Sequence, residues 1–88
     1  MQTITIEYNG GFCEPAKDAV DAAKKVRTAV VHTASRRPKI ELGGAVQSSS
    51  NQAIWMMNFY ERNCVGEKCF IARVFAAVED LNKVAELV

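Results

Sequence analysis

The stretch QAIWMMNFYER, residues 52–62, decides the fold that this sequence predicts. Ser49 and Gln52 have the spacing of a capping box, in which a serine side chain accepts a free backbone N–H and a glutamine reaches back to the cap. Residues 63–66 form a breaker region of the kind that ends helices. We therefore predict a helix that starts near Ser50, runs through this stretch and stops between Asn63 and Gly66.

The apolar side chains of this predicted helix lie in nearly every direction around its axis, whereas covering a sheet needs only one apolar stripe. If Ile54 and Met57 pack inward, then Trp55, Met56 and Phe59 face outward. Exposed aromatic and methionine side chains are typical of a surface that binds a protein partner. The alternative is that the helix lies between its neighbours and that these side chains belong to the core.

The rest of the chain follows two periods. An alternation of apolar and polar residues predicts strands, and apolar residues spaced by three and four predict amphipathic helices. The first helix begins at Glu14, with Pro15 in its first turn. The predicted strands are QTITIEY (2–8), TAVVHTA (28–34), KIEL (39–42, ended by Gly43–Gly44) and KCFIARV (68–74), and the last helix is AAVEDLNKVAELV (76–88).

The order of these elements is β-α-β-β-α-β-α. Each strand has one polar face and each helix has an apolar stripe, which favours a four-stranded antiparallel sheet with three helices on one face. We expect Ile4, Ile6, Ile40 and Leu42 to point at the helices. The 88 residues are enough for one α+β domain, residues 1–88, and too few for two.

Composition excludes several function classes. Acidic and basic residues are interspersed and the net charge is +1, so we expect neither nucleic-acid nor membrane partners. Cys13, Cys64 and Cys69 are odd in number and form no CxxC pair, which argues against a disulfide framework or a metal site. We expect no cofactor. Because no secretory or membrane-spanning segment is visible in the sequence, the expected localisation is cytoplasmic.

Several marks together resemble one known family. They are Gly10–Gly11 before the first predicted helix, Pro15–Ala16 in its first turn, a serine at the start of the second, Gly66 before the fourth strand, and a final helix ending in LV. Because these marks occur in this order and spacing, the chain resembles the histidine-containing phosphocarrier protein (HPr) of the bacterial sugar phosphotransferase system. The resemblance implies an open-faced β-sandwich with three helices on one face of the sheet.

The chain departs from this family where the family's chemistry resides. Alignment on Pro15 places Phe12 at the position of the phosphorylated histidine, Cys13 at a variable position and Glu14 in place of an arginine. Phe12 cannot carry a phosphoryl group, and Glu14 would repel one from the helix N-terminus. The resemblance therefore implies a regulatory adaptor that acts by protein binding, not an enzyme, whose partner is a phosphotransferase-system enzyme or regulator, or a second copy.

The resemblance also implies a docking face on the second helix, with regulatory phosphorylation at Ser49; Ser48 and Ser50 are alternatives in register, and helix capping alone would explain the serine. Two other functions remain open. One is an unrelated small α+β domain that binds a ligand or a protein. The other is a thiol-based carrier that uses Cys13, because a helix N-terminus lowers the pKa of a thiol. His32 is interpreted as an ordinary strand histidine.

Overall fold

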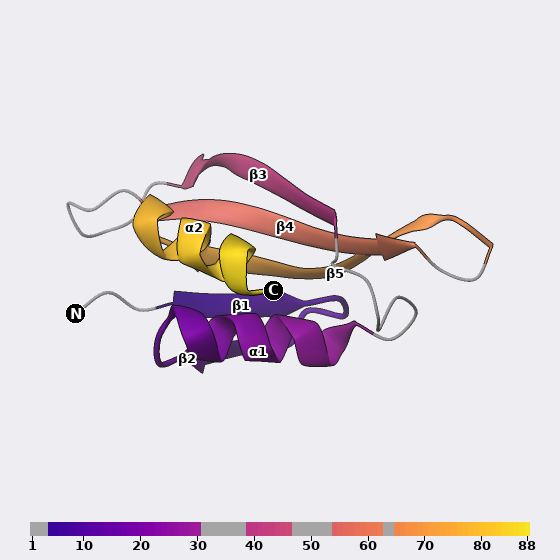
Figure 1. Cartoon of the computed structure of the whole chain (residues 1–88). Helices are drawn as coiled ribbons and strands as arrows, with labels where there is room; N and C mark the ends of the chain where they lie inside the picture. The colour runs from indigo at the N-terminus through magenta and orange to yellow at the C-terminus, as the bar shows by residue number, and fades with distance from the viewer. Residues whose placement is uncertain (1–3, 31–38, 47–53, 63–64) are drawn as a thin grey trace.

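The computed structural model describes residues 4–30, 39–46, 54–62 and 65–88. Its strands form one antiparallel sheet in the order β2-β1-β5-β4-β3 (Figure 1). The strands are β1 (Ile4–Tyr8), β2 (Cys13–Ala16), β3 (Lys39–Val46), β4 (Ile54–Arg62) and β5 (Lys68–Ala76), and the helices are α1 (Ala19–Ala29) and α2 (Val78–Leu87). The predicted four strands and three helices are therefore wrong: the described residues contain five strands and two helices, although the class remains α+β.

The first correction concerns the segment after β1. Gly10 and Gly11 have φ values of 105° and 89°, which only glycine adopts without strain, and they reverse the chain into a β1–β2 hairpin. The N–H of Tyr8 donates to the carbonyl of Phe12 across this turn at 2.8 Å. Pro15 lies on β2 and pairs with Thr5 of β1. Because β2 is an edge strand, the missing N–H of Pro15 is tolerated there. The prediction that a helix starts at Glu14 is wrong.

Helix α1 begins instead at Ala19. Asp18 has an extended backbone and caps the helix, because its Oδ1 accepts the N–H of Asp21 at 2.8 Å. The helix continues to Ala29, so the prediction of a strand beginning at Thr28 is wrong for its first two residues. Val30 is the C-cap of α1, and the rest of that predicted strand, residues 31–34 including His32, lies outside the described residues.

The second correction concerns residues 54–62, which form strand β4 and not a helix. Met57 and Phe59 are buried on the face that packs against the helices, while Met56 and Asn58 alternate with them on the other face. Both faces of β4 carry large apolar side chains, so the two-residue alternation is hidden in the sequence. Ser48, Ser49 and Ser50 lie outside the described residues.

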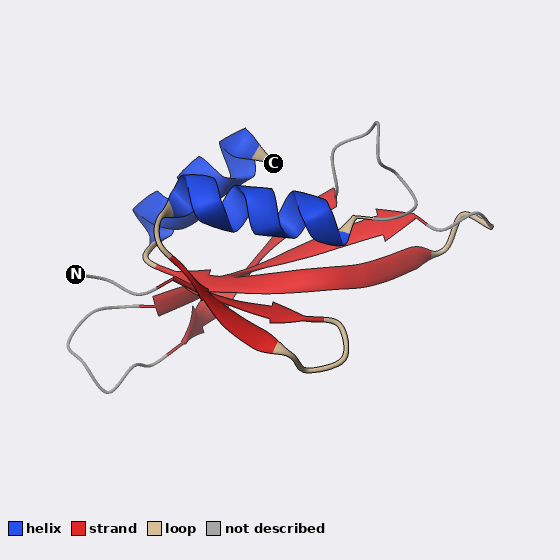
Figure 2. Cartoon of the chain, turned by 90° about the horizontal axis from the view of Figure 1, so that it is seen from below, coloured by secondary structure: helices blue, strands red, loops and turns tan. Residues whose placement is uncertain are grey.

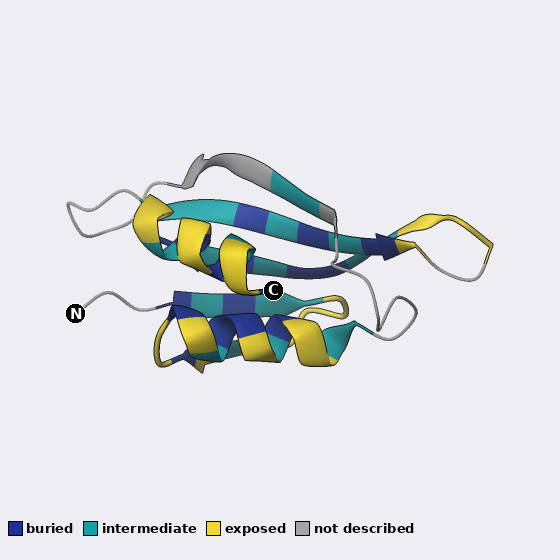
Figure 3. Cartoon of the chain, in the orientation of Figure 1, coloured by how far each residue is buried: buried dark blue, intermediate teal, exposed yellow. Residues whose placement is uncertain are grey.

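Both helices cover the same face of the sheet (Figure 2). Helix α1 is buried along the side that faces β1 and exposed along the opposite side (Figure 3). Small residues on its buried side, such as Ala22 and Ala23, let the helix approach the strands closely. The largest fully buried side chains of this layer are Ile6, Val26, Phe59, Val74, Leu81 and Val84.

Several local predictions are confirmed. Strands occur at Ile4–Tyr8, Lys39–Val46 and Lys68–Ala76, and the last helix is present. Ile4 and Ile6 are buried in the core, and Ile40 packs against it. The prediction that Gly43 and Gly44 end their strand is wrong, because β3 continues to Val46. Neither helix of the described residues combines the length and the apolar composition that crossing a membrane requires.

Candidate functional site

A hollow of about 320 Å³ lies between the β1–β2 hairpin and helix α1. This volume is at the lower end of the range for small-molecule sites. The hairpin contributes Tyr8, Phe12 and Glu14 to its lining, and α1 contributes Lys24, Lys25, Thr28 and Ala29. Most of the lining is apolar, and the polar groups come from few side chains, which is the usual composition of a ligand site.

An aromatic pair forms one wall of the hollow. The rings of Tyr8 and Phe12 are stacked, with centroids 5.9 Å apart and an interplanar angle of 17°. The glycine turn brings the two rings together, since it places Phe12 directly across the hairpin from Tyr8. Phe12 remains 64% exposed, so a large apolar surface is available beside the hollow.

Glu14 and Tyr8 form the main hydrogen bond of the hairpin side. The Tyr8 hydroxyl donates to Glu14 Oε1 at 2.6 Å. Burial raises the pKa of Tyr8, and the hydrogen bond to Glu14 and the negative charges of Glu14 and Asp21 raise it further. The phenol therefore keeps its proton and remains a donor to Glu14. The second carboxylate oxygen, Glu14 Oε2, has no hydrogen bond within the described part of the chain.

The two lysines on α1 differ in their surroundings. Lys25 Nζ donates to both oxygens of Asp21, at 2.9 and 3.0 Å, and this hydrogen bonding raises the pKa of Lys25. Asp21 also accepts the backbone N–H of Lys17, which with Lys25 lowers the pKa of its carboxyl group. The ammonium of Lys24 is exposed and has no partner among the described residues. Lys24 therefore lines the hollow with an ammonium group that can pair with a ligand.

The four residues predicted as a degenerate phosphate site do not form one site. Phe12 and Glu14 line the hollow, whereas Cys13 and Pro15 pair with Glu7 and Thr5 and so belong to the opposite face of β2. None of the four lies at a helix N-terminus, since α1 is capped by Asp18. The expected placement of these residues at a helix N-terminus is therefore wrong, because the glycines make a hairpin where the resemblance implies the start of a helix.

Cys13 is exposed, and its thiol lies 3.7 Å from the carbonyl oxygen of Gly11. The helix dipole invoked for a reactive Cys13 is absent, because the residue lies in a strand. Cys69 is half-buried, and Cys64 lies outside the described residues. No group of residues that could hold a metal ion occurs in the described ranges.

The predicted partner-binding residues Trp55, Met56 and Phe59 lie on different faces of strand β4. Phe59 is fully buried in the core, so the prediction that it lies on the surface is wrong. Trp55 packs partly against the core, and Met56 lies half-buried on the face without helices. A strand sends neighbouring side chains to opposite faces, so these three residues cannot form one exposed cluster.

Sequence reasoning missed Tyr8 and Lys24 as site residues. In the sequence, Tyr8 is one position in the alternation of the first strand, and Lys24 falls outside the apolar stripe of the first helix, so neither residue stands out as functional. Their proximity depends on the hairpin, and Gly10–Gly11 is the signal that could have revealed it.

We compared the chain with models of protein families, with curated proteins and with solved structures, and none of them gave a match. The interpretation of the hollow therefore rests on its own geometry.

Proposed function

We propose that this protein is a small binding module whose hollow between the β1–β2 hairpin and α1 takes a planar aromatic molecule with a carboxylate group. The adaptor hypothesis presupposes the four-stranded, three-helix fold that the resemblance implies, whereas the described residues form five strands and two helices. Of the alternatives that the sequence leaves open, a ligand-binding α+β domain fits the hollow best.

The observation that carries this proposal is an exposed aromatic wall beside an ammonium group without a partner. A flat apolar ligand that covers Phe12 would bury surface that the chain alone leaves in water, at about 25 cal/mol per Å². Lys24 would receive the carboxylate of the ligand. Glu14 Oε2 can accept an N–H of the ligand, because the first oxygen of Glu14 is already bonded to Tyr8.

The affinity of the protein for indole-3-acetate, measured by titration calorimetry at low salt, tests this proposal. Indole-3-acetate has a planar ring, one N–H and a carboxylate, whereas tryptamine carries an ammonium on the same ring. We expect indole-3-acetate to bind more tightly than tryptamine. Lys24→Ala should weaken its binding about two- to fivefold, the range of an exposed ion pair, and Phe12→Ala about two- to tenfold through loss of ring stacking.

Lys83→Ala is the matched control, because Lys83 is an exposed lysine on α2, outside the lining of the hollow. It should leave the affinity unchanged. Equal affinity for the two indoles, or an effect of Lys83→Ala as large as that of Lys24→Ala, would refute the proposed ligand class.

The cytoplasm is the compartment that we propose for this module. Cys13 and Cys69 are free thiols, and Cys13 is exposed. Exposed thiols persist in a reducing compartment and become oxidised outside it.

A further inference from the structure

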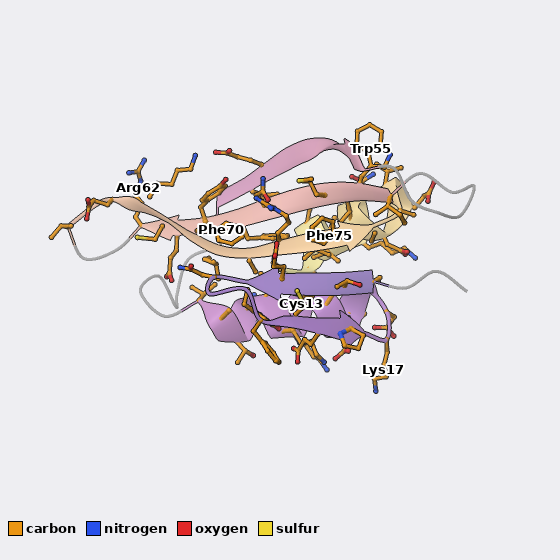
Figure 4. All side chains as sticks on the ribbon, turned by 180° about the vertical axis from the view of Figure 1, so that it is seen from behind. Cys13, Lys17, Trp55, Arg62, Phe70 and Phe75 are labelled. Atoms are coloured by element: carbon orange, nitrogen blue, oxygen red, sulfur yellow. The ribbon has the colours of Figure 1, made fainter. Side chains whose placement is uncertain are left out.

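The face of the sheet without helices carries three rows of side chains that cross the strands. Figure 4 shows this face, with Phe70, Phe75 and Cys13 on β5 and β2. No helix of the described residues covers it. It lies on the opposite side of the sheet from the hollow, so an interaction there is independent of the proposed ligand.

The middle row is polar and crosses all five strands. Backbone register aligns Cys13, Glu7, Arg73, Asn58 and Glu41. Arg73 Nε donates to Asn58 Oδ1 at 2.7 Å, and one terminal nitrogen of the Arg73 guanidinium lies 3.6 Å from Glu7 Oε1. The Arg73 and Glu7 side chains are 36% and 33% exposed, so both can contact a partner on this face.

The rows on either side of the polar row are largely apolar. On one side, register aligns Pro15, Thr5, Phe75 and Met56. On the other side, the rings of Tyr60 and Phe70 meet edge to face, with centroids 5.9 Å apart. Lys68 Nζ lies 4.3 Å from the centroid of the Tyr60 ring and is paired with Glu41, so this cation is already satisfied within the chain.

We propose that this face packs against the same face of a second copy and forms a two-fold symmetric dimer. A two-fold axis parallel to the strands, midway between β1 and β5, would place β1 of each copy against β5 of the other. Glu7 of each copy would then meet Arg73 of the other, and the apolar row would meet the apolar row. The face is therefore complementary in charge and in polarity to itself, as an isologous interface requires.

The size of the face fits this partner. The five strands span on the order of 20 Å across the sheet, and the longest of them, β4 and β5, are on the order of 30 Å long, so the face has a flat area of at most about 600 Å². Side chains make its accessible surface larger than this flat area, which brings it near the roughly 800 Å² per partner of a standard interface. Packing two sheets face to face is a common arrangement that buries the side chains of both inner faces. A nucleic-acid partner fits less well, because the carboxylates of Glu7 and Glu41 lie beside Arg73 and Lys68 on this face and would repel phosphate groups.

The molar mass in solution, measured by sedimentation equilibrium over a range of concentrations, tests this proposal. We expect the full chain to approach twice the monomer mass, and we expect Phe75→Glu to remain a monomer over the same range. Val20→Glu is the matched control, because Val20 is 50% exposed on α1, on the helix side of the sheet. This control should dimerise like the original chain.

A pair of charge-reversal variants keeps the test decisive even if Phe75→Glu misfolds. Glu7→Arg and Arg73→Glu should each be monomeric alone, because each would place like charges opposite one another across the interface. An equimolar mixture should form a heterodimer, because both cross-interface pairs then have opposite charges. A chain that stays monomeric at every concentration, a dimer that Phe75→Glu leaves intact, or a mixture that fails to associate would overturn the proposal.

Discussion

At the scale of single residues, Tyr8 and its neighbours across the hairpin form one side of the hollow. Sequence reasoning identified Phe12 and Glu14 as unusual, because they stand where the resembled family has a histidine and an arginine. The structure gives them a different setting, in which Phe12 stacks on Tyr8 and Glu14 accepts its hydroxyl. No local sequence pattern predicts these contacts among Tyr8, Phe12 and Glu14, since each residue fits the turn or strand in which it lies without them.

The titration of Tyr8 tests this setting. Tyr60 is the only other tyrosine, so in the Tyr60→Phe variant the phenolate that appears near 295 nm on ionisation comes from Tyr8 alone. We expect this phenol to ionise well above its ordinary pKa of 10.0, because burial and the Glu14 carboxylate disfavour the phenolate. Glu14→Gln should bring the midpoint back toward 10.0. Ionisation of Tyr8 near pH 10 in the folded protein would contradict the described hydrogen bond.

The same shift has a consequence for stability. Above pH 10 the unfolded chain loses the Tyr8 proton while the folded chain keeps it, so this residue's contribution to the free energy of unfolding falls as the pH rises. Below pH 10 both states hold the proton and the contribution is constant. Tyr8→Phe should therefore show a smaller loss of stability between pH 9 and pH 11 than the original chain in urea denaturation.

At the scale of elements, the sequence predicts the segments whose period is unambiguous and fails where two explanations compete. The alternation over Ile4–Tyr8 and the apolar stripe of Val78–Leu87 are both confirmed. Strand β2 was missed because it has only four residues and contains Pro15, which also suits the first turn of a helix. Strand β4 was missed because its residues on the face without helices, such as Met56 and Tyr60, are as large and apolar as those on the helix face, so no alternation is visible.

A helix that starts at Ala19 and one that starts at Glu14 predict stability changes of opposite sign for the substitution Asp18→Ala. In the structure Asp18 is the N-cap, so Asp18→Ala should lower the free energy of unfolding by about 1 kcal/mol. Asp18→Asn is the matched control and should have little effect, because asparagine caps equally well. Had the helix begun at Glu14, Asp18 would lie inside it, and alanine, the best helix former, would stabilise it. Chemical denaturation of the two variants measures the difference.

At the scale of the whole molecule, the two faces of the sheet have different surroundings. The helices and the hollow lie on one face, and the charged and aromatic rows lie on the other. The pairing of β1 with β5 joins the two ends of the chain, and local periodicity contains no information about such a long-range partner. For this reason the layers could be predicted from the sequence, while the strand order and the hollow could not.

The proposed ligand binds on the helix face of the sheet, beside the β1–β2 hairpin. Amide chemical shifts of the nitrogen-15-labelled full chain, followed during titration with indole-3-acetate, test it most directly. We expect the largest changes at Tyr8, Phe12, Lys24 and Thr28, the residues that line the hollow. Changes centred on the strands of the opposite face, or no changes at the hairpin while the ligand binds, would contradict the account.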